Sequence, residues 1–158
     1  MRRREFIALL GSAAVTPQCA QAEPVPALLP IAKRLVGAWR FVAAASLRDD
    51  GTSFDRWGPN TRGTLTFDRS GSFVQVIMAA ESRMFGAKSF FAFGDYYVEE
   101  ESKTIVTNIE GSSIAKIIGG VQRRVVTSLT DDELKYVNLA NAAGQKVEAV
   151  WRRFQKPG

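Results

Sequence analysis

The chain has 158 residues, 46% of them hydrophobic and 23% charged, with a net charge of +5, which suits one folded domain. It has no histidine, and its single cysteine, Cys19, lies close to the N-terminus. We therefore expect no zinc, copper or iron–sulfur site, no other cofactor, and no serine–histidine or cysteine–histidine nucleophile system. Carboxylates, lysines, tyrosines, hydroxyls and amides remain for any chemistry.

Residues 1–22 have the pattern of an export signal. Arg3 and Arg4 precede Phe6 as in the twin-arginine motif, a mildly apolar run follows, and an A-x-A cleavage site ends at Ala22. We expect the twin-arginine export machinery to carry the precursor, and cleavage near Ala22 to leave a periplasmic or secreted protein. The apolar run is too short to span a bilayer, so we expect no stable membrane insertion of the mature chain. Three arginines leave with the leader, and no nucleic-acid partner is expected.

Residues 23–34 contain three prolines and predict an extended N-terminus, with a helical turn possible over 31–36. Short strand-like runs then follow, separated by turn residues. Alternating apolar residues and turn signals predict strands at residues 39–47, 62–68, 72–79, 91–100, 104–110, 121–129, 133–139 and 146–154. Residues 80–89 lose the alternation and predict a surface loop or short helix. Residues 111–120 predict a second long connection with one apolar helical turn.

The first strand opens on Gly37-Ala38-Trp39, and the last ends in a basic run around Arg152. Because the later connections are short, neighbouring strands should be antiparallel. Residues 35–156 therefore predict an all-β fold, a single eight-stranded antiparallel up-and-down barrel with short helical segments in its long connections. Such a barrel is just wide enough to hold one small ligand.

Four groups of residues resemble the bacterial lipocalin-like family, small relatives of the lipocalin barrels. They are residues 35–40, residues 58–63, residues 93–98 with 109–112, and residues 122–124 with 150–153. The resemblance implies an eight-stranded barrel and a small apolar or amphipathic ligand, and it names no reaction. It also implies that Trp39, the tryptophan of the Gly37-x-Trp39 motif, plugs the closed end of the barrel. An arginine of the last strand, Arg152 or its neighbour Arg153, would then pack over the indole ring.

The strand pattern also predicts which side chains line the lumen. On the first strand, alternation places Trp39, Phe41, Ala43, Ala45 and Leu47 on one face, and the small alanines would keep the lumen open. The expected ligand-binding residues are Phe41, Ala43, Phe67, Ile77, Tyr97, Asn108 and Tyr136.

The strand at 104–110 leaves two alternatives open. Asn108 and Glu110 share one face, and Ile105 and Ile109 share the other. If the polar face points inward near Arg124, it forms a buried cluster suited to ligand recognition or proton transfer. Otherwise the isoleucines form the core and the polar face meets solvent.

Three functions follow from these expectations. The first is binding of a small hydrophobic or amphipathic molecule in the lumen. The second is a cofactor-free isomerase, cyclase or hydratase with Glu110 as acid or base and Arg124 or a tyrosine as its electrostatic partner. The third is a ligand-free barrel that acts through surface contacts, for example through residues 82–93.

Overall fold

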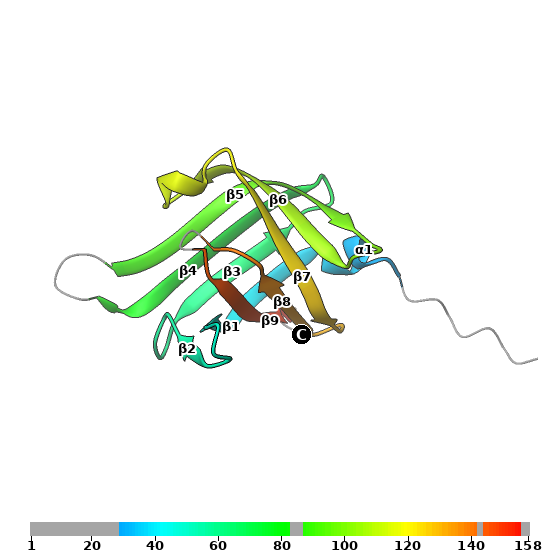
Figure 1. The fold of residues 1–158 in the computed structure, drawn as a ribbon. Helices are drawn as coiled ribbons and strands as arrows, with labels where there is room; N and C mark the ends of the chain where they lie inside the picture. Colours follow the sequence, from blue (N-terminus) through cyan, green and yellow to red (C-terminus); the bar gives the residue numbers. More distant parts are fainter. Residues whose placement is uncertain (1–28, 83–86, 142–143, 156–158) are drawn as a thin grey trace, which may run out of the picture.

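The computed structural model describes residues 29–82, 87–141 and 144–155, so the predicted export signal at 1–22 lies outside the described residues. A short helix precedes a series of strands (Figure 1). The elements are α1 (Ile31–Leu35), β1 (Gly37–Leu47), β2 (Ser53–Asp55), β3 (Arg62–Phe67), β4 (Ser72–Ser82), β5 (Ala87–Glu99), β6 (Thr104–Ser112), the 3-10 turn η1 (Ala115–Ile117), β7 (Val121–Leu129), β8 (Glu133–Asn138) and β9 (Lys146–Arg153). No described helix combines the length and apolar character needed to cross a membrane.

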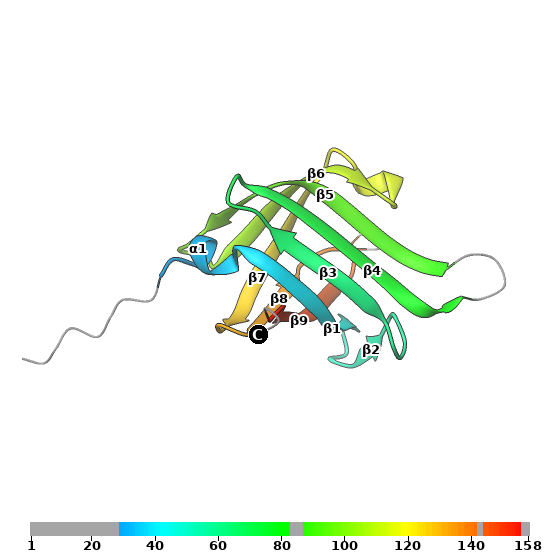
Figure 2. The same cartoon turned by 180° about the vertical axis from the view of Figure 1, so that it is seen from behind.

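The sheet closes on itself. Strands β1 and β3 to β9 pair in chain order, each antiparallel to its neighbour, and β9 returns to pair with β1 from Trp39↔Arg153 to Leu47↔Lys146. The two ribbon views show the resulting barrel from opposite sides (Figures 1 and 2). The short β2 pairs only with the end of β1, beyond the part of that strand that β3 occupies. The predicted eight-stranded up-and-down barrel is therefore confirmed, with β2 as an unpredicted addition.

The expected loop over residues 80–89 was wrong at both ends. Strand β4 continues to Ser82 and β5 begins at Ala87, and these two residues pair after a register shift beyond Met78. The irregular pairing explains why the alternation fades in the sequence although the backbone stays extended. The predicted helical turns are present as α1 and η1.

A β-bulge on β1 changes which of its side chains point inward. The pairing with β9 shifts between Phe41 and Ala43, so Val42 is an extra residue on this strand. Trp39 and Phe41 are buried before the bulge, and Ala44 and Ser46 are buried after it. The predicted inward face of Ala43, Ala45 and Leu47 is therefore wrong, because one inserted residue reverses the alternation beyond it.

One end of the barrel is closed by Trp39, which is fully buried. Its indole N–H donates to the carbonyl oxygen of Leu35 at 2.9 Å, which ties β1 to the end of α1. The guanidinium of Arg153 lies 4.0 Å from the ring centroid and donates to the carbonyl oxygens of Arg34 at 2.6 Å and Val36 at 3.0 Å. A cation stacked on an indole thus also satisfies the carbonyl groups at the end of the helix.

The arginine over Trp39 is Arg153, and the expectation that named Arg152 is corrected. Arg153 pairs directly opposite Trp39, so both side chains share the inner face, whereas Arg152 lies opposite Arg40 and is exposed. Gly37 fits this arrangement because its φ is +129° and an added Cβ would lie 3.0 Å from Nη1 of Arg153. A larger residue there would be strained and would press on the guanidinium.

Helix α1 is held against the turn between β5 and β6. The Glu100 carboxylate accepts hydrogen bonds from the backbone N–H groups of Ile31 at 2.9 Å and Ala32 at 2.8 Å. A carboxylate at a helix N-terminus satisfies N–H groups that have no partner within the helix. Large buried side chains fill this half of the barrel, namely Leu35, Trp39, Leu65, Phe67, Phe73 and Trp151.

Candidate functional site

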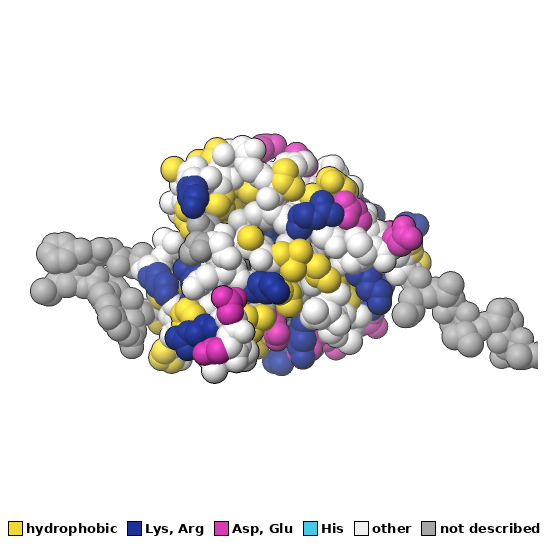
Figure 3. All heavy atoms as spheres, in the orientation of Figure 1, with side chains coloured by type: hydrophobic (Ala, Val, Ile, Leu, Met, Phe, Trp, Pro, Cys, Tyr) yellow, Lys and Arg dark blue, Asp and Glu magenta, His cyan; other side chains and the backbone are white. Residues whose placement is uncertain are grey.

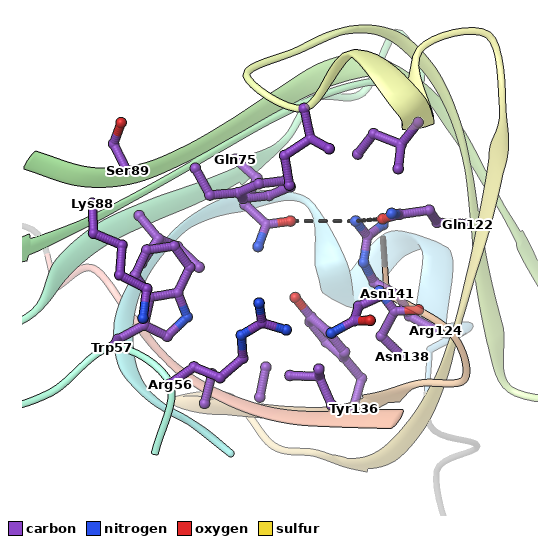
Figure 4. A pocket seen from close by; sticks show the side chains of 17 residues that line it. Arg56, Trp57, Gln75, Lys88, Ser89, Gln122, Arg124, Tyr136, Asn138 and Asn141 are labelled. Carbon is purple, nitrogen blue, oxygen red and sulfur yellow. Dashed lines mark hydrogen bonds between the residues drawn. The ribbon is translucent and has the colours of Figure 1, made fainter. Parts of the chain in front are cut away.

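The other half of the barrel contains a cavity of about 280 Å³ (Figure 4). Strands β1, β4, β5, β7, β8 and β9 contribute to its wall, together with η1 and two connections. The lining side chains are Ala44, Arg56, Trp57, Gln75, Ile77, Lys88, Ser89, Phe90, Ile114, Ile117, Gln122, Arg124, Tyr136, Asn138, Asn141, Val147 and Ala149.

Two alanines leave part of this space open. Ala44 on β1 and Ala149 on β9 pair directly opposite each other, and both are buried. Tyr136 on β8 lies opposite Ala149 on the next strand. Because side chains in direct register project from the same face, two methyl groups stand where two large side chains would fill the lumen.

Arg124 is the most unusual side chain in the cavity wall. It points inward from β7 and is only 2% exposed. Its Nη1 donates to Thr107 Oγ1 at 2.7 Å, and its Nη2 donates to Gln122 Oε1 at 3.0 Å and Gln75 Oε1 at 3.3 Å. The guanidinium carbon also lies 5.7 Å from the ring centroid of Tyr136. Figure 4 shows the amide oxygens of both glutamines directed at this guanidinium.

Burial is the main influence on the titration of these groups. It lowers the pKa of Arg124, and the interaction with the Tyr136 hydroxyl opposes that shift. Burial also raises the pKa of the Tyr136 hydroxyl, and the positive charge of Arg124 opposes this second shift. The directions are those expected when a charged form loses its hydration. Arg124 nevertheless stays protonated in ordinary buffers, as arginines in proteins do.

Among the described residues, no negative charge offsets the positive charge of this site. Every hydrogen-bond acceptor of Arg124 is neutral, and the described part of the cavity lining contains Arg56, Lys88 and Arg124 but no aspartate or glutamate. In the part of the chain that the structure describes, no ion pair involves any of the three. A buried guanidinium without a counter-charge costs several kcal/mol after relaxation, so this arrangement carries a cost that packing alone does not explain.

The structure places four of the expected lumen residues inside the barrel. Ile77 and Tyr136 line the cavity. Phe41 and Phe67 are also buried but are not among the residues that line the cavity, and Phe41 meets Trp151 edge-on with ring centroids 5.3 Å apart. These two phenylalanines therefore pack inside the barrel without bordering the cavity.

Three expected lumen residues lie on the outer surface. Ala43 is exposed because of the bulge on β1. Tyr97 is 51% exposed, and the Asn108 side-chain amide donates to the Asp95 carboxylate in a solvent-exposed hydrogen bond. Their assignment to the lumen is wrong. On β6 the isoleucine face points inward, with Ile105 fully buried, which settles the alternative left open by the sequence.

Glu110 also lies outside the lumen. It is exposed and is the extra residue of a bulge, since Gly94 pairs with Ile109 and Phe93 with Gly111. Arg124 points into the cavity, so the expected pairing of Glu110 with Arg124 inside the barrel is wrong. The enzyme hypothesis thereby loses the acid or base on which it rested.

Several residues of the cavity were not singled out by the sequence as a site. Gln75 points inward between the buried Phe73 and Ile77 on β4, and that polar interruption was a usable signal. Gln122 points inward on β7, two residues before Arg124. Arg56, Trp57 and Asn141 come from connections between strands. No periodicity identifies such residues, because the path of a loop depends on the strands that it joins.

No family model matches this sequence. No curated protein matches it either. Solved structures with a similar fold do exist. A redesigned β-barrel is similar with a TM-score of 0.47 and 13% identity, over 78% of this chain and 95% of that chain. A de novo designed fluorescence-activating β-barrel has a TM-score of 0.47 and 14% identity, over 80% and 100%. A bovine odorant-binding protein in complex with a selenium-containing odorant has a TM-score of 0.45 and 20% identity, over 87% and 80%.

Proposed function

We propose that this barrel binds a small amphipathic molecule in its lumen. The observation that carries the proposal is the cavity between the paired alanines Ala44 and Ala149 and the polar group around Arg124. Ligand sites commonly combine apolar walls with a few convergent polar groups. The volume of about 280 Å³ lies just below the range of about 300–1,000 Å³ for such sites, so the ligand is small.

The first experiment is a fluorescence titration with N-phenyl-1-naphthylamine, a neutral apolar probe whose emission rises on leaving water. The wild-type protein should bind it, and Ala44→Leu should weaken binding at least tenfold because the added side chain occupies the cavity. Ala43→Leu is the matched control, since it adds the same side chain on the outer face one residue away. Ala149→Val tests the neighbouring position on β9 if Ala44→Leu lowers the melting temperature.

Two results would contradict lumen binding. One is an unchanged affinity in both cavity variants, provided that circular dichroism shows them folded. The other is equal weakening by Ala43→Leu and Ala44→Leu, which would place the probe on the surface. Neither result depends on the identity of the natural ligand.

We also propose that the protein acts after export, which the residues Arg3, Arg4 and Phe6 support. Replacing both arginines by lysine should leave the precursor in the cytoplasm, because the twin-arginine pathway reads that pair. Cell fractionation with detection of the C-terminus measures this. Efficient export of the double-lysine variant would refute the pathway, and the lumen proposal would be unaffected.

The third hypothesis, action through surface contacts, has partial support. The outer face of β4 and β5 exposes Val74, Met78, Phe91 and Phe93, each by more than two-fifths, and Val74 pairs opposite Phe93. Scattered hydrophobic side chains also appear on the face seen in Figure 3. This hypothesis assumes a barrel that holds no ligand and has a filled lumen, however, and the lumen contains a cavity. Ligand binding therefore accounts for more of the structure.

A further inference from the structure

We infer that the lumen selects small organic anions, and that a carboxylate headgroup of the ligand pairs with Arg124. This inference rests on the proposed lumen binding and adds the chemical class of the ligand. It is carried by the arrangement of charged and neutral groups around the cavity.

The first argument is the environment of the guanidinium. Arg124 is 2% exposed and its hydrogen bonds go to one hydroxyl and two amide oxygens. These neutral acceptors hold the side chain in one orientation without neutralising it. A guanidinium presents N–H donors in a planar fork that matches the two oxygens of a carboxylate. A carboxylate in the adjacent cavity would supply the missing charge.

The second argument is that the charged side chains in the described part of the lining are all positive. Arg56 comes from the connection between β2 and β3, and Lys88 comes from the start of β5. In Figure 4 the Arg56 guanidinium points into the same space as Arg124, with the Tyr136 hydroxyl between them. Like charges directed at one cavity repel each other, and an anion placed among them lowers that energy.

The third argument is the presence of apolar surface in the same cavity. Gln75 and Gln122 accept hydrogen bonds from Arg124, and Tyr136 lies beside it, while the wall also includes the apolar side chains Ile77, Phe90, Ile117 and Val147. A ligand with one charged end and a short hydrocarbon body matches both parts. A neutral alcohol would leave the guanidinium without a counter-charge, and an ammonium ion would add to the repulsion.

The test compares three probes with the same hydrocarbon chain, namely octanoate, 1-octanol and octylammonium. Isothermal titration calorimetry at pH 7.5 measures each affinity for the wild-type protein. We expect octanoate to bind at least tenfold more tightly than 1-octanol, and octylammonium to bind least. Raising the salt concentration should weaken octanoate binding and leave 1-octanol binding nearly unchanged.

Arg124→Met tests the assigned residue, because it keeps much of the side-chain volume and removes the charge. It should abolish the preference for octanoate and preserve or improve the binding of 1-octanol. Arg123→Met is the matched control. Arg123 is the adjacent residue on β7, but its side chain is on the outer surface and pairs with Glu99. This variant should keep the wild-type preference.

If Arg124→Met does not fold, the wild-type protein still decides the matter through pH. Octanoate affinity should fall as the pH drops through the carboxyl pKa of the probe, whereas 1-octanol affinity should not. Equal binding of octanoate and 1-octanol by the wild type, or an unchanged preference in folded Arg124→Met, would overturn the anion inference while leaving lumen binding intact. Failure of all three probes and of the neutral fluorophore would refute both proposals.

Discussion

Two adjacent arginines on β7 show how one strand serves two environments. Arg123 points outward and pairs with Glu99, whose carboxylate hydrogen bond raises the pKa of the guanidinium. Arg124 points inward, where burial lowers its pKa. Alternation along a strand therefore places one guanidinium in solvent with a counter-charge and the next in the lumen without one. Burying the Arg124 guanidinium without a counter-charge lowers the free energy of unfolding, and this effect can be measured.

Arg124→Met should make the ligand-free protein more stable. Removing a buried charge that lacks a counter-charge removes its desolvation penalty, and even buried ion pairs can often be replaced by apolar residues of similar volume with a stability change between neutral and about 1–4 kcal/mol stabilising. The free energy of unfolding from urea denaturation measures the effect. A large loss of stability would mean that the hydrogen bonds of Arg124 to Thr107, Gln75 and Gln122 outweigh the cost of its charge.

At the closed end, Arg153→Ala should lower the free energy of unfolding by about 2 kcal/mol or more. The variant removes the cation from the face of Trp39 and leaves the carbonyl oxygens of Arg34 and Val36 without these donors. Arg152→Ala is the matched control and should change stability little, because Arg152 is exposed. Chemical denaturation of the two variants compares them directly. Equal losses of unfolding free energy in the two variants would argue against Arg153 as the arginine that stabilises the closed end around Trp39.

At the scale of strands, bulges decide where the sequence pattern succeeds. Phe41 precedes the bulge on β1 and its inward orientation was predictable, whereas Ala43 follows the bulge and was assigned to the wrong face. Glu110 occupies the bulge between β5 and β6. A bulge inserts one residue without changing composition, so period-two reasoning holds only between bulges. The strands and their order were predictable because each run is short and its turn residues are distinct.

Outward side chains also join strands that do not pair directly. Glu99 on β5 reaches Arg123 on β7 across β6. Val106 on β6 pairs with both Tyr97 and Arg123 and is only 1% exposed although it is on the outer face. The long polar side chains beside Val106 therefore shield it from water, as the aliphatic parts of such residues commonly do.

The ion pair between Glu99 and Arg123 across β6 predicts that the stability of the fold depends on pH. The hydrogen bond from Arg123 is the main reason why the pKa of Glu99 is lowered from its ordinary value of 4.5. A carboxyl whose folded-state pKa is depressed stabilises the fold above its unfolded pKa, and this contribution disappears as the pH falls through the folded pKa. Glu99→Gln should therefore be less stable than the wild type near neutral pH, and the difference should vanish in acid.

Melting temperatures measured from pH 7 to pH 2 test the prediction, with Glu101→Gln as a control for the loss of one negative charge. A difference between Glu99→Gln and the wild type that stays constant down to the lowest pH would show that the ion pair does not cause it.

For the whole molecule, closure of the sheet was the most predictable feature and the polar site the least. The Gly37-x-Trp39 opening and the basic last strand indicated a closed barrel, and β9 does pair with β1. The charged lining was not predictable as a unit. It combines Arg124 from a strand with Arg56 from a connection, and these side chains face the same cavity only because the sheet closes into a barrel. Periodicity describes each strand alone and contains no information about what faces it across the lumen.

The division of the barrel into a packed half and a hollow half predicts unequal local stability. Trp39 and Leu65 lie in the packed half, whereas Gln122 and Val147 border the cavity. Regions with fewer buried contacts open more easily by local unfolding. Without ligand, the backbone amides of Gln122 and Val147 should therefore exchange with deuterium faster than those of Trp39 and Leu65.

Ligand binding should reduce the difference in exchange rate between the amides that border the cavity and those in the packed half. An occupant of the cavity must leave before the surrounding strands can open, so octanoate should slow exchange at Gln122 and Val147 by a factor that grows with its concentration. Amide hydrogen exchange followed by NMR measures each position, with Arg124→Met in the same octanoate concentration as the comparison. Slower exchange confined to β4 and β5, with the amides of Gln122 and Val147 unchanged, would move the binding site from the lumen to the exposed apolar face of those two strands.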